Sequence, residues 1–383
     1  MELIKTFDLA LDTELELLEL LCLGLTTPCE QKMFEDLIRS SCLHWGELLE
    51  QALRHKMLPM LAFHATSSQF KETVPKFVRS HLWTALGLNI HKTAILRREA
   101  ARIVRVLDEQ SIPFVGTKGI TLESTLYEGN GTRRLGDMDF MVAPKHRDVV
   151  TNTMSKLGYK MGEFNWQTGN VHPLTREKMA IFKLNPDHLP HFILLTGDPV
   201  VPFVDVDFAN SLTWTRSPFN VPIVAALAEI VYQPIPGIPD IQMPCFNPKF
   251  QFIFTILHLF REAWVFREGW TESLLEGYEY DVNISKFADV IRLWRTYQNE
   301  LNAPDFIQTL EEFQIIDPIL WVLEHTDRTF HTGIVPALGL EGRVTEEWLH
   351  SAGGAGGKRV QWKGTMRERL HCKDRRQLFL TDT

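Results

Sequence analysis

Gly136-Asp137-Met138-Asp139-Phe140-Met141-Val142 is the segment of this 383-residue chain that decides its fold. Side chains alternate between the two faces of a strand, so Asp137 and Asp139 share one face while Met138 and Phe140 share the other. Two carboxylates on an otherwise apolar strand repel each other and lose hydration unless a positive charge lies beside them. The segment therefore predicts a strand with one face in the core and an acidic face that holds a cation.

A second segment, Phe203-Val204-Asp205-Val206-Asp207-Phe208, repeats this pattern later in the chain. Asp205 and Asp207 share one face, and apolar residues alternate with them. If the two segments pair as neighbouring strands, their carboxylates converge, which suits a hard divalent cation such as magnesium bridging substrate phosphates. The alternative is a pair of surface strands with their acids in water.

The residues ahead of Asp137 are typical of a phosphate site. Ile112 to Ile120 predicts a short buried strand and then the turn Gly116-Thr117-Lys118-Gly119, before a short helix and a glycine-rich loop. A glycine turn that opens a helix leaves backbone N–H groups free at the positive end of the helix dipole, where an anion docks. Lys118 adds a mobile cation, and Arg133 adds a planar donor fork.

This order of elements resembles the nucleotidyltransferase superfamily, whose best-known member is DNA polymerase β. The stretch FVGTKGITLESTLYEGNGTRRLGDMDFMV, followed by SKLGYK, is similar to a largely uncharacterised bacterial branch of nucleotidyltransferases. That branch pairs a lysine-glycine turn with Arg-x-x-Gly-Asp-x-Asp and, downstream, an acidic residue two positions before a histidine. The resemblance covers residues 108–215 well, and more weakly the helical stretch with His258 and Asp289.

The resemblance implies two sets of site residues. The set that is both catalytic and metal-binding is Asp137, Asp139 and Asp205. The set that holds the phosphates of the nucleotide is Gly116, Thr117, Lys118, Gly119, Arg133 and Gly136. Two positions depart from the branch: Asp207 stands where histidine is usual, and Arg134 stands where proline is frequent.

The function implied is a metal-dependent nucleotidyltransferase that moves a nucleoside monophosphate from an NTP to a hydroxyl acceptor and releases pyrophosphate. Magnesium, or manganese in its place, is the expected cofactor, and an NTP such as ATP is the co-substrate. A small molecule or a peptide or protein is expected as the acceptor, because a net charge of -8 does not suit nucleic acid. A catalytically inactive nucleotide-binding module and a magnesium-dependent phosphotransferase stay open as alternatives.

The composition is that of an ordinary globular protein, with 44% hydrophobic and 23% charged residues. No apolar run reaches the roughly 18 residues that span a bilayer, and the first residues lack the layout of a signal peptide. The five cysteines have no Cys-x-x-Cys spacing. Reduced thiols in a cytoplasmic protein with no membrane contact are the simplest expectation.

The predicted fold is α+β, with a nucleotidyltransferase-type mixed β-sheet core flanked by N- and C-terminal helical regions. Four segments are expected: a helical region at 1–107, the nucleotidyltransferase core at 108–215, a helical domain at 216–345, and a glycine-rich linker with a basic tail at 346–383. The strands expected in the core are Pro113–Val115, Met138–Val142, Met179–Leu184, His191–Leu195 and Phe203–Phe208. Beyond them, Ile223–Val231 is expected to be helical, and the proline-rich Gln233–Pro244 is expected to be a loop.

Several other features allow two interpretations. Ser351 to Gly357 predicts a flexible tether, and the basic tail beyond it is expected to be mobile and solvated rather than bound to an anionic partner. His188 and His191 flank a proline, which makes a zinc site improbable. His258 is either a core histidine or a residue that lines the cleft, and Asp289 is either a structural acid or a substrate contact.

Overall fold

The structure is a computed structural model that describes residues 12–184, 187–214, 217–264, 282–302, 304–353, 359–372 and 375–380. The chain divides into two compact units. The sheet unit comprises residues 87–261 and 296–319, and the helical unit comprises residues 1–86, 262–295 and 320–383. The division into four segments stays a prediction.

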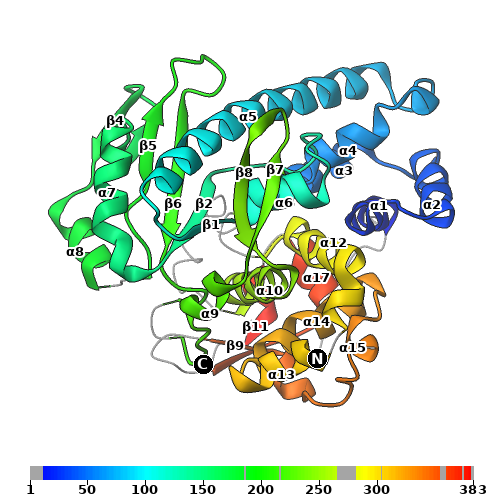
Figure 1. Cartoon of the computed structure of the whole chain (residues 1–383). Coiled ribbons are helices and arrows are strands. Elements are labelled where there is room, and N and C mark those ends of the chain that lie inside the picture. Colours follow the sequence, from blue (N-terminus) through cyan, green and yellow to red (C-terminus); the bar gives the residue numbers. More distant parts are fainter. Residues whose placement is uncertain are drawn as a thin grey trace. The chain divides into compact units, whose positions relative to one another are not determined.

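The sheet unit is built on eight strands in the order β4-β3-β5-β6-β2-β1-β8-β7 (Figure 1). The strands are β1 (Phe114–Thr117), β2 (Met138–Val142), β3 (Lys160–Asn165), β4 (Asn170–Pro173), β5 (Phe192–Leu195), β6 (Phe203–Ala209), β7 (Ile230–Ile235) and β8 (Ile238–Phe246). The helices that lie wholly or mostly in this unit are α5 (Lys76–Glu109), α6 (Lys118–Leu126), α7 (Arg147–Lys156), α8 (Arg176–Leu184), α9 (Ile223–Ala228), α10 (Pro248–Trp264) and α13 (Pro304–Glu312), with the 3-10 turn η3 (Pro144–His146).

The sheet is mixed, as predicted. β2 pairs with β6, and β1 pairs with β8, in parallel, whereas β1–β2, β3–β4, β3–β5, β5–β6 and β7–β8 are antiparallel. Helices precede and follow the sheet along the chain. The predicted α+β fold with a mixed sheet and flanking helices is therefore confirmed.

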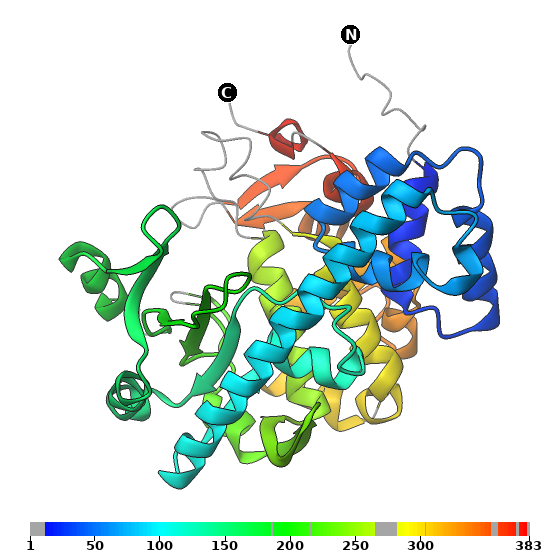
Figure 2. The same ribbon diagram turned by 90° about the horizontal axis from the view of Figure 1, so that it is seen from above.

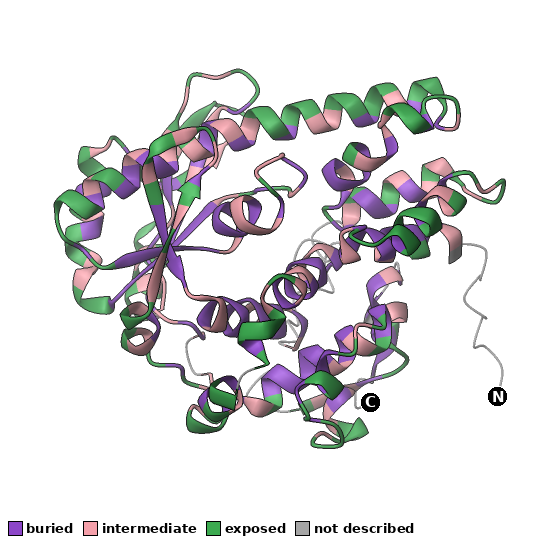
Figure 3. Ribbon diagram, turned by 45° about the vertical axis from the view of Figure 1, so that its right-hand side comes forward, coloured by how far each residue is buried: buried purple, intermediate pink, exposed green. Residues whose placement is uncertain are grey.

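One face of the sheet packs on the long helix α5, which is continuous in both Figure 1 and Figure 2. The alternate apolar residues of β2 and β6 point into this core, where they meet apolar residues of α5 and α7. Its members include Met138, Phe140, Val142, Val204, Val206, Phe208, Leu96, Val104, Val150 and Met154. Figure 3 shows the purple, buried centre of the sheet. The period-two pattern of both strands thus fixes which face is left for the carboxylates.

The helical unit contains, wholly or for the most part, α1 (Asp12–Leu23), α2 (Pro28–Ile38), α3 (Trp45–Arg54), α4 (Leu58–Ala65), η2 (Ser68–Phe70), α12 (Ile284–Leu301), α14 (Ile316–Phe330), α15 (Ile334–Ala337), α16 (Glu346–Leu349), α17 (Met366–His371) and η6 (Arg375–Leu378). The leucine-rich helix α1 belongs to the core, since Leu17, Leu18 and Leu21 are fully buried. Among the described residues, no helix combines the length and the apolar character needed to cross a bilayer.

The prediction of a mobile, solvated C-terminal tail is wrong for the described residues. Ser351–Gly353 forms β9, which pairs with β10 (Arg359–Trp362), and β10 pairs in turn with β11 (Phe379–Leu380). Arg369 is fully buried and donates a hydrogen bond to the carbonyl of Ala263, 2.5 Å away. The basic residues misled the interpretation because a buried arginine satisfied by carbonyl oxygens has the same sequence signature as a solvated one.

Two further local predictions are wrong, and a third is confirmed only in part. Met179–Leu184 lies in α8, where the hydroxyl of Thr175 accepts a hydrogen bond from the N–H of Lys178 and caps the helix start. The expected helix at Ile223 ends at Ala228, and the expected loop at Gln233–Pro244 is the β7–β8 hairpin. Pro234 lies on the edge strand β7, where proline does not disrupt the hydrogen-bond ladder, whereas Pro239 and Pro244 lie on the inner strand β8.

His325 of α14 makes the stability of the helical unit depend on pH. Its ring packs on Trp321 and Trp362, with centroids 4.4 and 5.5 Å apart, and its Nε2–H donates to the carbonyl of Leu349. Burial lowers the pKa of His325 to about 3. The unfolded chain takes up this proton near pH 6.5, well before the folded protein does, so stability present above pH 6.5 is lost as the pH falls.

We therefore expect the free energy of unfolding to fall by about 2 kcal/mol through this residue between pH 6.5 and pH 5. A His325→Gln variant keeps a donor for Leu349 and should lose correspondingly less over the same range. Urea unfolding at a series of pH values measures both proteins. Equal losses in the two proteins would contradict the assignment to His325.

Candidate active site

The two acidic segments form the neighbouring parallel strands β2 and β6. Asp139 lies directly opposite Asp207 in the register of this pair. Asp137 immediately precedes β2, and both Asp137 and Asp205 are half-buried. Since the apolar residues of both strands point into the core beside α5, the carboxylates share the opposite face. The strand pairing on which the predicted cation site depends is confirmed.

Lys118 reaches this acidic face from the start of α6. Its Nζ lies 2.6 Å from Oδ1 of Asp139 and 6.0 Å from the centroid of the Phe254 ring in α10. Burial alone would lower the pKa of Lys118, but the carboxylates of Asp139 and Asp207 outweigh this effect and raise it above its ordinary value. Lys118 therefore carries a stable positive charge that neutralises Asp139.

Two histidines are the partners of the β6 carboxylates, a role that sequence reasoning missed. His191 Nδ1 lies 2.8 Å from Oδ1 of Asp205, and His188 Nδ1 lies 3.1 Å from Oδ2 of Asp207. The hydrogen bond to Asp205 raises the pKa of His191 to about 9, although burial opposes it. Burial would raise the pKa of Asp207, but the hydrogen bond to His188 outweighs it and lowers that pKa to about 2.

The carboxylates still repel one another. The negative charge of Asp139, followed by burial, raises the pKa of Asp137. Hard oxygen donors held close enough to repel suit a divalent cation such as magnesium. In the described part of the chain, no three His, Cys, Asp or Glu side chains are arranged around a common ion position. The carboxylate oxygens are donors of the kind that magnesium prefers, but they are not gathered around one ion position, and Lys118 is the partner of Asp139.

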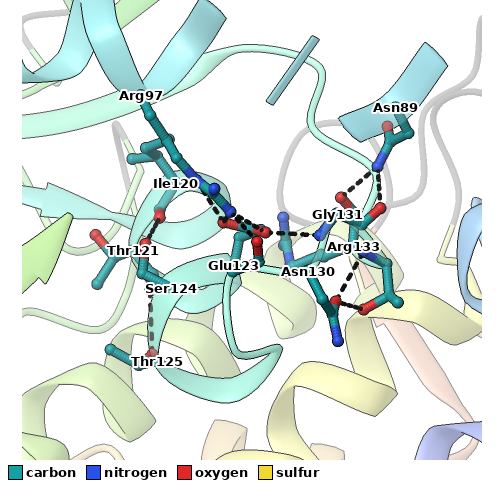
Figure 4. A network of polar contacts seen from close by, with 12 residues as sticks. Asn89, Arg97, Ile120, Thr121, Glu123, Ser124, Thr125, Asn130, Gly131 and Arg133 are labelled. Atoms are coloured by element: carbon teal, nitrogen blue, oxygen red, sulfur yellow. Dashed lines mark hydrogen bonds and ion pairs between the residues drawn. The ribbon is translucent and has the colours of Figure 1, made fainter. Parts of the chain in front are cut away.

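A buried ion pair fixes the glycine-rich loop that leads into β2 (Figure 4). Arg97 of α5 and Glu123 of α6 pair at 2.6 Å, with side chains 13% and 0% exposed. Glu123 also accepts a hydrogen bond from the N–H of Gly131, and Arg97 donates to the carbonyl of Gly129. Asn89 of α5 donates to the carbonyls of Gly131 and Arg133. These contacts hold the backbone that positions the start of β2.

The predicted glycine turn before α6 has a different shape in the structure. Gly116 and Thr117 complete β1, and α6 begins directly at Lys118, whose φ of +47° makes the whole change of direction. A Cβ on Gly116 would lie 2.6 Å from the sulfur of Met243, so the Met243 side chain would have to shift to admit a larger residue. The hydroxyl of Thr117 donates to the carbonyl of Asp139. Phosphate contacts by Gly116 and Thr117 stay predictions.

The remaining predicted phosphate-side residues lie in two places. A Cβ on Gly119 would come 3.0 Å from Nη1 of Arg133, so the glycine makes room for that guanidinium beside α6. Gly136 is exposed, and its carbonyl accepts a hydrogen bond from Lys92 Nζ at 3.0 Å. Burial, with the nearby charge of Arg134, lowers the pKa of Lys92. Sequence reasoning missed Lys92 because nothing in a long helix signals which lysine faces a distant strand.

His258 lines a pocket beside the acidic face. The residues around this pocket are Lys118, His188, Ala209, Ser211, Leu212, Thr213, Trp214, Phe254, Leu257, His258 and Arg261. His258 is half-buried and stacks on Phe254, with ring centroids 6.2 Å apart. Its interpretation as a residue that lines the site is thus favoured. Asp289 is buried in α12 of the helical unit.

Residues 41–331 match the model of a protein family described as uncharacterised nucleotidyltransferase. The match spans most of the chain, including the acidic strands, Lys118 and the helix that carries His258. It confirms the resemblance on which the site residues were predicted. A comparison with curated proteins finds no match.

We expect the buried ion pair of the glycine-rich loop to contribute strongly to stability. Glu123→Ala should lower the free energy of unfolding by about 3–5 kcal/mol, because it leaves the charge of Arg97 buried and uncompensated. Glu163→Ala is the matched control: Glu163 pairs with Lys178, also at 2.6 Å, but both side chains are at least half exposed. The control should lose at most about 1 kcal/mol. Similar losses in urea unfolding would contradict the structural role of the loop contacts.

Proposed function

Because the chain belongs to the family of uncharacterised nucleotidyltransferases, we propose that it transfers a nucleoside monophosphate from an NTP to a hydroxyl acceptor and releases pyrophosphate. The observation that supports this most directly is the pairing of β2 with β6, which gathers the acidic residues on one face of the sheet with Lys118 beside them. Members of such families usually use an NTP and a divalent metal ion. A cytoplasmic location is part of the same proposal.

Asp137, Asp139 and Asp205 would hold magnesium, or manganese, in this site. When bound, the ions activate the acceptor hydroxyl and neutralise the charge of the departing pyrophosphate. Asp207 has a different task, since its charge is already engaged by His188 and it lies deeper than Asp205. Asp207 and Asp139 together keep Lys118 protonated at the edge of the site.

The residues of the chain orient the reacting groups. Lys118 would donate to an oxygen of the nucleotide phosphates, and Arg133 would steady the same end of the nucleotide. Asp205 accepts the proton of the acceptor hydroxyl. His191, hydrogen-bonded to Asp205 at 2.8 Å, holds that carboxylate in one orientation. Exposed atoms of His191 and Asp205 leave this end of the acidic face open to an acceptor.

Incubating the protein with α-labelled NTPs and a cell extract tests the proposal. A labelled product together with free pyrophosphate is expected. A phosphorylated product with NDP would instead identify a phosphotransferase, and an unchanged extract would favour an inactive nucleotide-binding module. The acceptor is proposed to be a small molecule, a peptide or a protein, and the mass of the product distinguishes these classes.

Asp137→Asn should abolish transfer while the fold stays intact. The amide keeps the shape of the side chain and removes the charge that repels Asp139, so the melting temperature should be unchanged or slightly raised. Loss of a metal ligand should lower the transfer rate by about 1,000-fold or more. Activity and melting temperature are measured on the same preparation. A fully active Asp137→Asn protein would contradict the proposal that Asp137 is a metal ligand.

Asp205 should matter more for transfer than Asp207. Asp205→Asn should be inactive, whereas Asp207→Asn should keep part of its activity, because Asp207 acts through His188 and Lys118 and not on the acceptor. Transfer rates at saturating NTP compare the two variants. The reverse ranking would identify Asp207 as the third metal ligand and move the acceptor by one pair of residues along β6.

A further inference from the structure

The pocket beside the acidic face has the chemistry of an anion site. Four of its lining residues carry basic side chains, and two carry hydroxyl groups: Lys118, His188, His258, Arg261, Ser211 and Thr213. No residue described as lining it is acidic. The rings of Trp214 and Phe254 form apolar walls, which strengthen electrostatic contacts by excluding water. An oxygen-rich anion with several negative charges fits this lining best.

The pocket is directly connected to the carboxylates. His188 Nδ1 lies 3.1 Å from Asp207, and its Nε2 lies 3.4 Å from Nη1 of Arg261. An arginine N–H can only donate, so Nε2 of His188 accepts and its Nδ1–H donates to Asp207. His258 and Arg261 are three residues apart on α10 and therefore share one helix face. The geometry thus aligns Asp207, His188 and Arg261 in one chain of contacts.

The direction of β6 indicates which reacting group lies nearest the pocket. Asp205 lies near the start of this strand and Asp207 follows it. Ala209 and the residues from Ser211 to Trp214 line the pocket at and beyond the end of the strand. At about 3.3 Å per residue, roughly 13 Å separates Asp205 from Ala209. In-line displacement puts the leaving group opposite the attacking hydroxyl. With the acceptor at Asp205, the leaving group therefore departs toward the pocket.

We propose that this pocket binds the β- and γ-phosphates of the NTP, with Arg261 and His258 of α10 as phosphate ligands in addition to Lys118. The inference rests on the proposed function, which supplies the direction of transfer. It assigns to α10 a role in holding pyrophosphate that the acidic strands and the start of α6 do not provide. Specificity for the base plays no part in it, since the contacts are to phosphate oxygens.

Inorganic triphosphate with magnesium is the probe, because it carries the phosphates without a base or sugar. Arg261→Gln should raise its Kd at least about tenfold in calorimetric titration of the full-length protein. Arg105→Gln, which changes an exposed arginine of α5, is the matched control and should bind as the wild type does. His258→Gln is the second pocket variant, in case Arg261→Gln unfolds, and circular dichroism checks both.

The outcomes separate the pocket from the transfer reaction. Weaker binding of triphosphate by the pocket variants, with unchanged binding of Mn²⁺ alone, supports the proposal. Unchanged triphosphate binding in folded pocket variants overturns it, and so does a wild-type protein that does not bind triphosphate. The experiment with α-labelled NTPs tests the transfer reaction independently. If the protein binds triphosphate through Arg261 but labels no acceptor, the proposed transferase activity is contradicted and the proposed phosphate-binding pocket is retained.

Discussion

Repulsion between carboxylates on one face of β2 and β6 is the constraint on which the rest of the site depends. Asp139 and Asp207 lie opposite each other on paired strands, and the charge of Asp139 raises the pKa of Asp137. Positive and hydrogen-bonding groups offset this cost: Lys118 at Asp139, His191 at Asp205 and His188 at Asp207. Lys118 comes from α6, and both histidines come from the residues just before β5, so the electrostatic balance ties these two segments to the sheet.

The same balance explains how one site can be stable and still receive a cation. Lys118 is anchored by its backbone at the end of β1, while its long side chain spans the distance to Asp139. A side chain of this kind can exchange one anionic partner for another without any change in the backbone. The pocket that Lys118 also lines lies within reach of the same ammonium group. The proposed metal binding and the proposed phosphate binding would therefore depend on one connected set of charges.

The acidic strands could be predicted because strand periodicity is local. The alternation of acidic and apolar residues over a few positions indicates that Asp137 and Asp139 share one face, and that Asp205 and Asp207 do the same. The roles of His188, His191 and Lys92 could not be predicted from the sequence. The roles of the two histidines depend on which strands become neighbours, and that of Lys92 depends on how α5 lies across the sheet. The β7–β8 hairpin was missed since proline is tolerated on an edge strand. The described tail was misjudged since charge does not reveal whether an arginine meets water or buried carbonyl oxygens.

The ion pair between Arg97 and Glu123 limits which substitutions this sequence can accept during evolution. Their ion pair is almost completely buried and also satisfies the backbone of Gly129 and Gly131. Replacing either residue alone leaves the other charge buried without a partner. A chain with only one of the two substitutions is therefore expected to fold poorly. The two positions are thus expected to vary together or not at all among related chains. The loop that delivers the acidic strand is inherited with the helices that carry this pair.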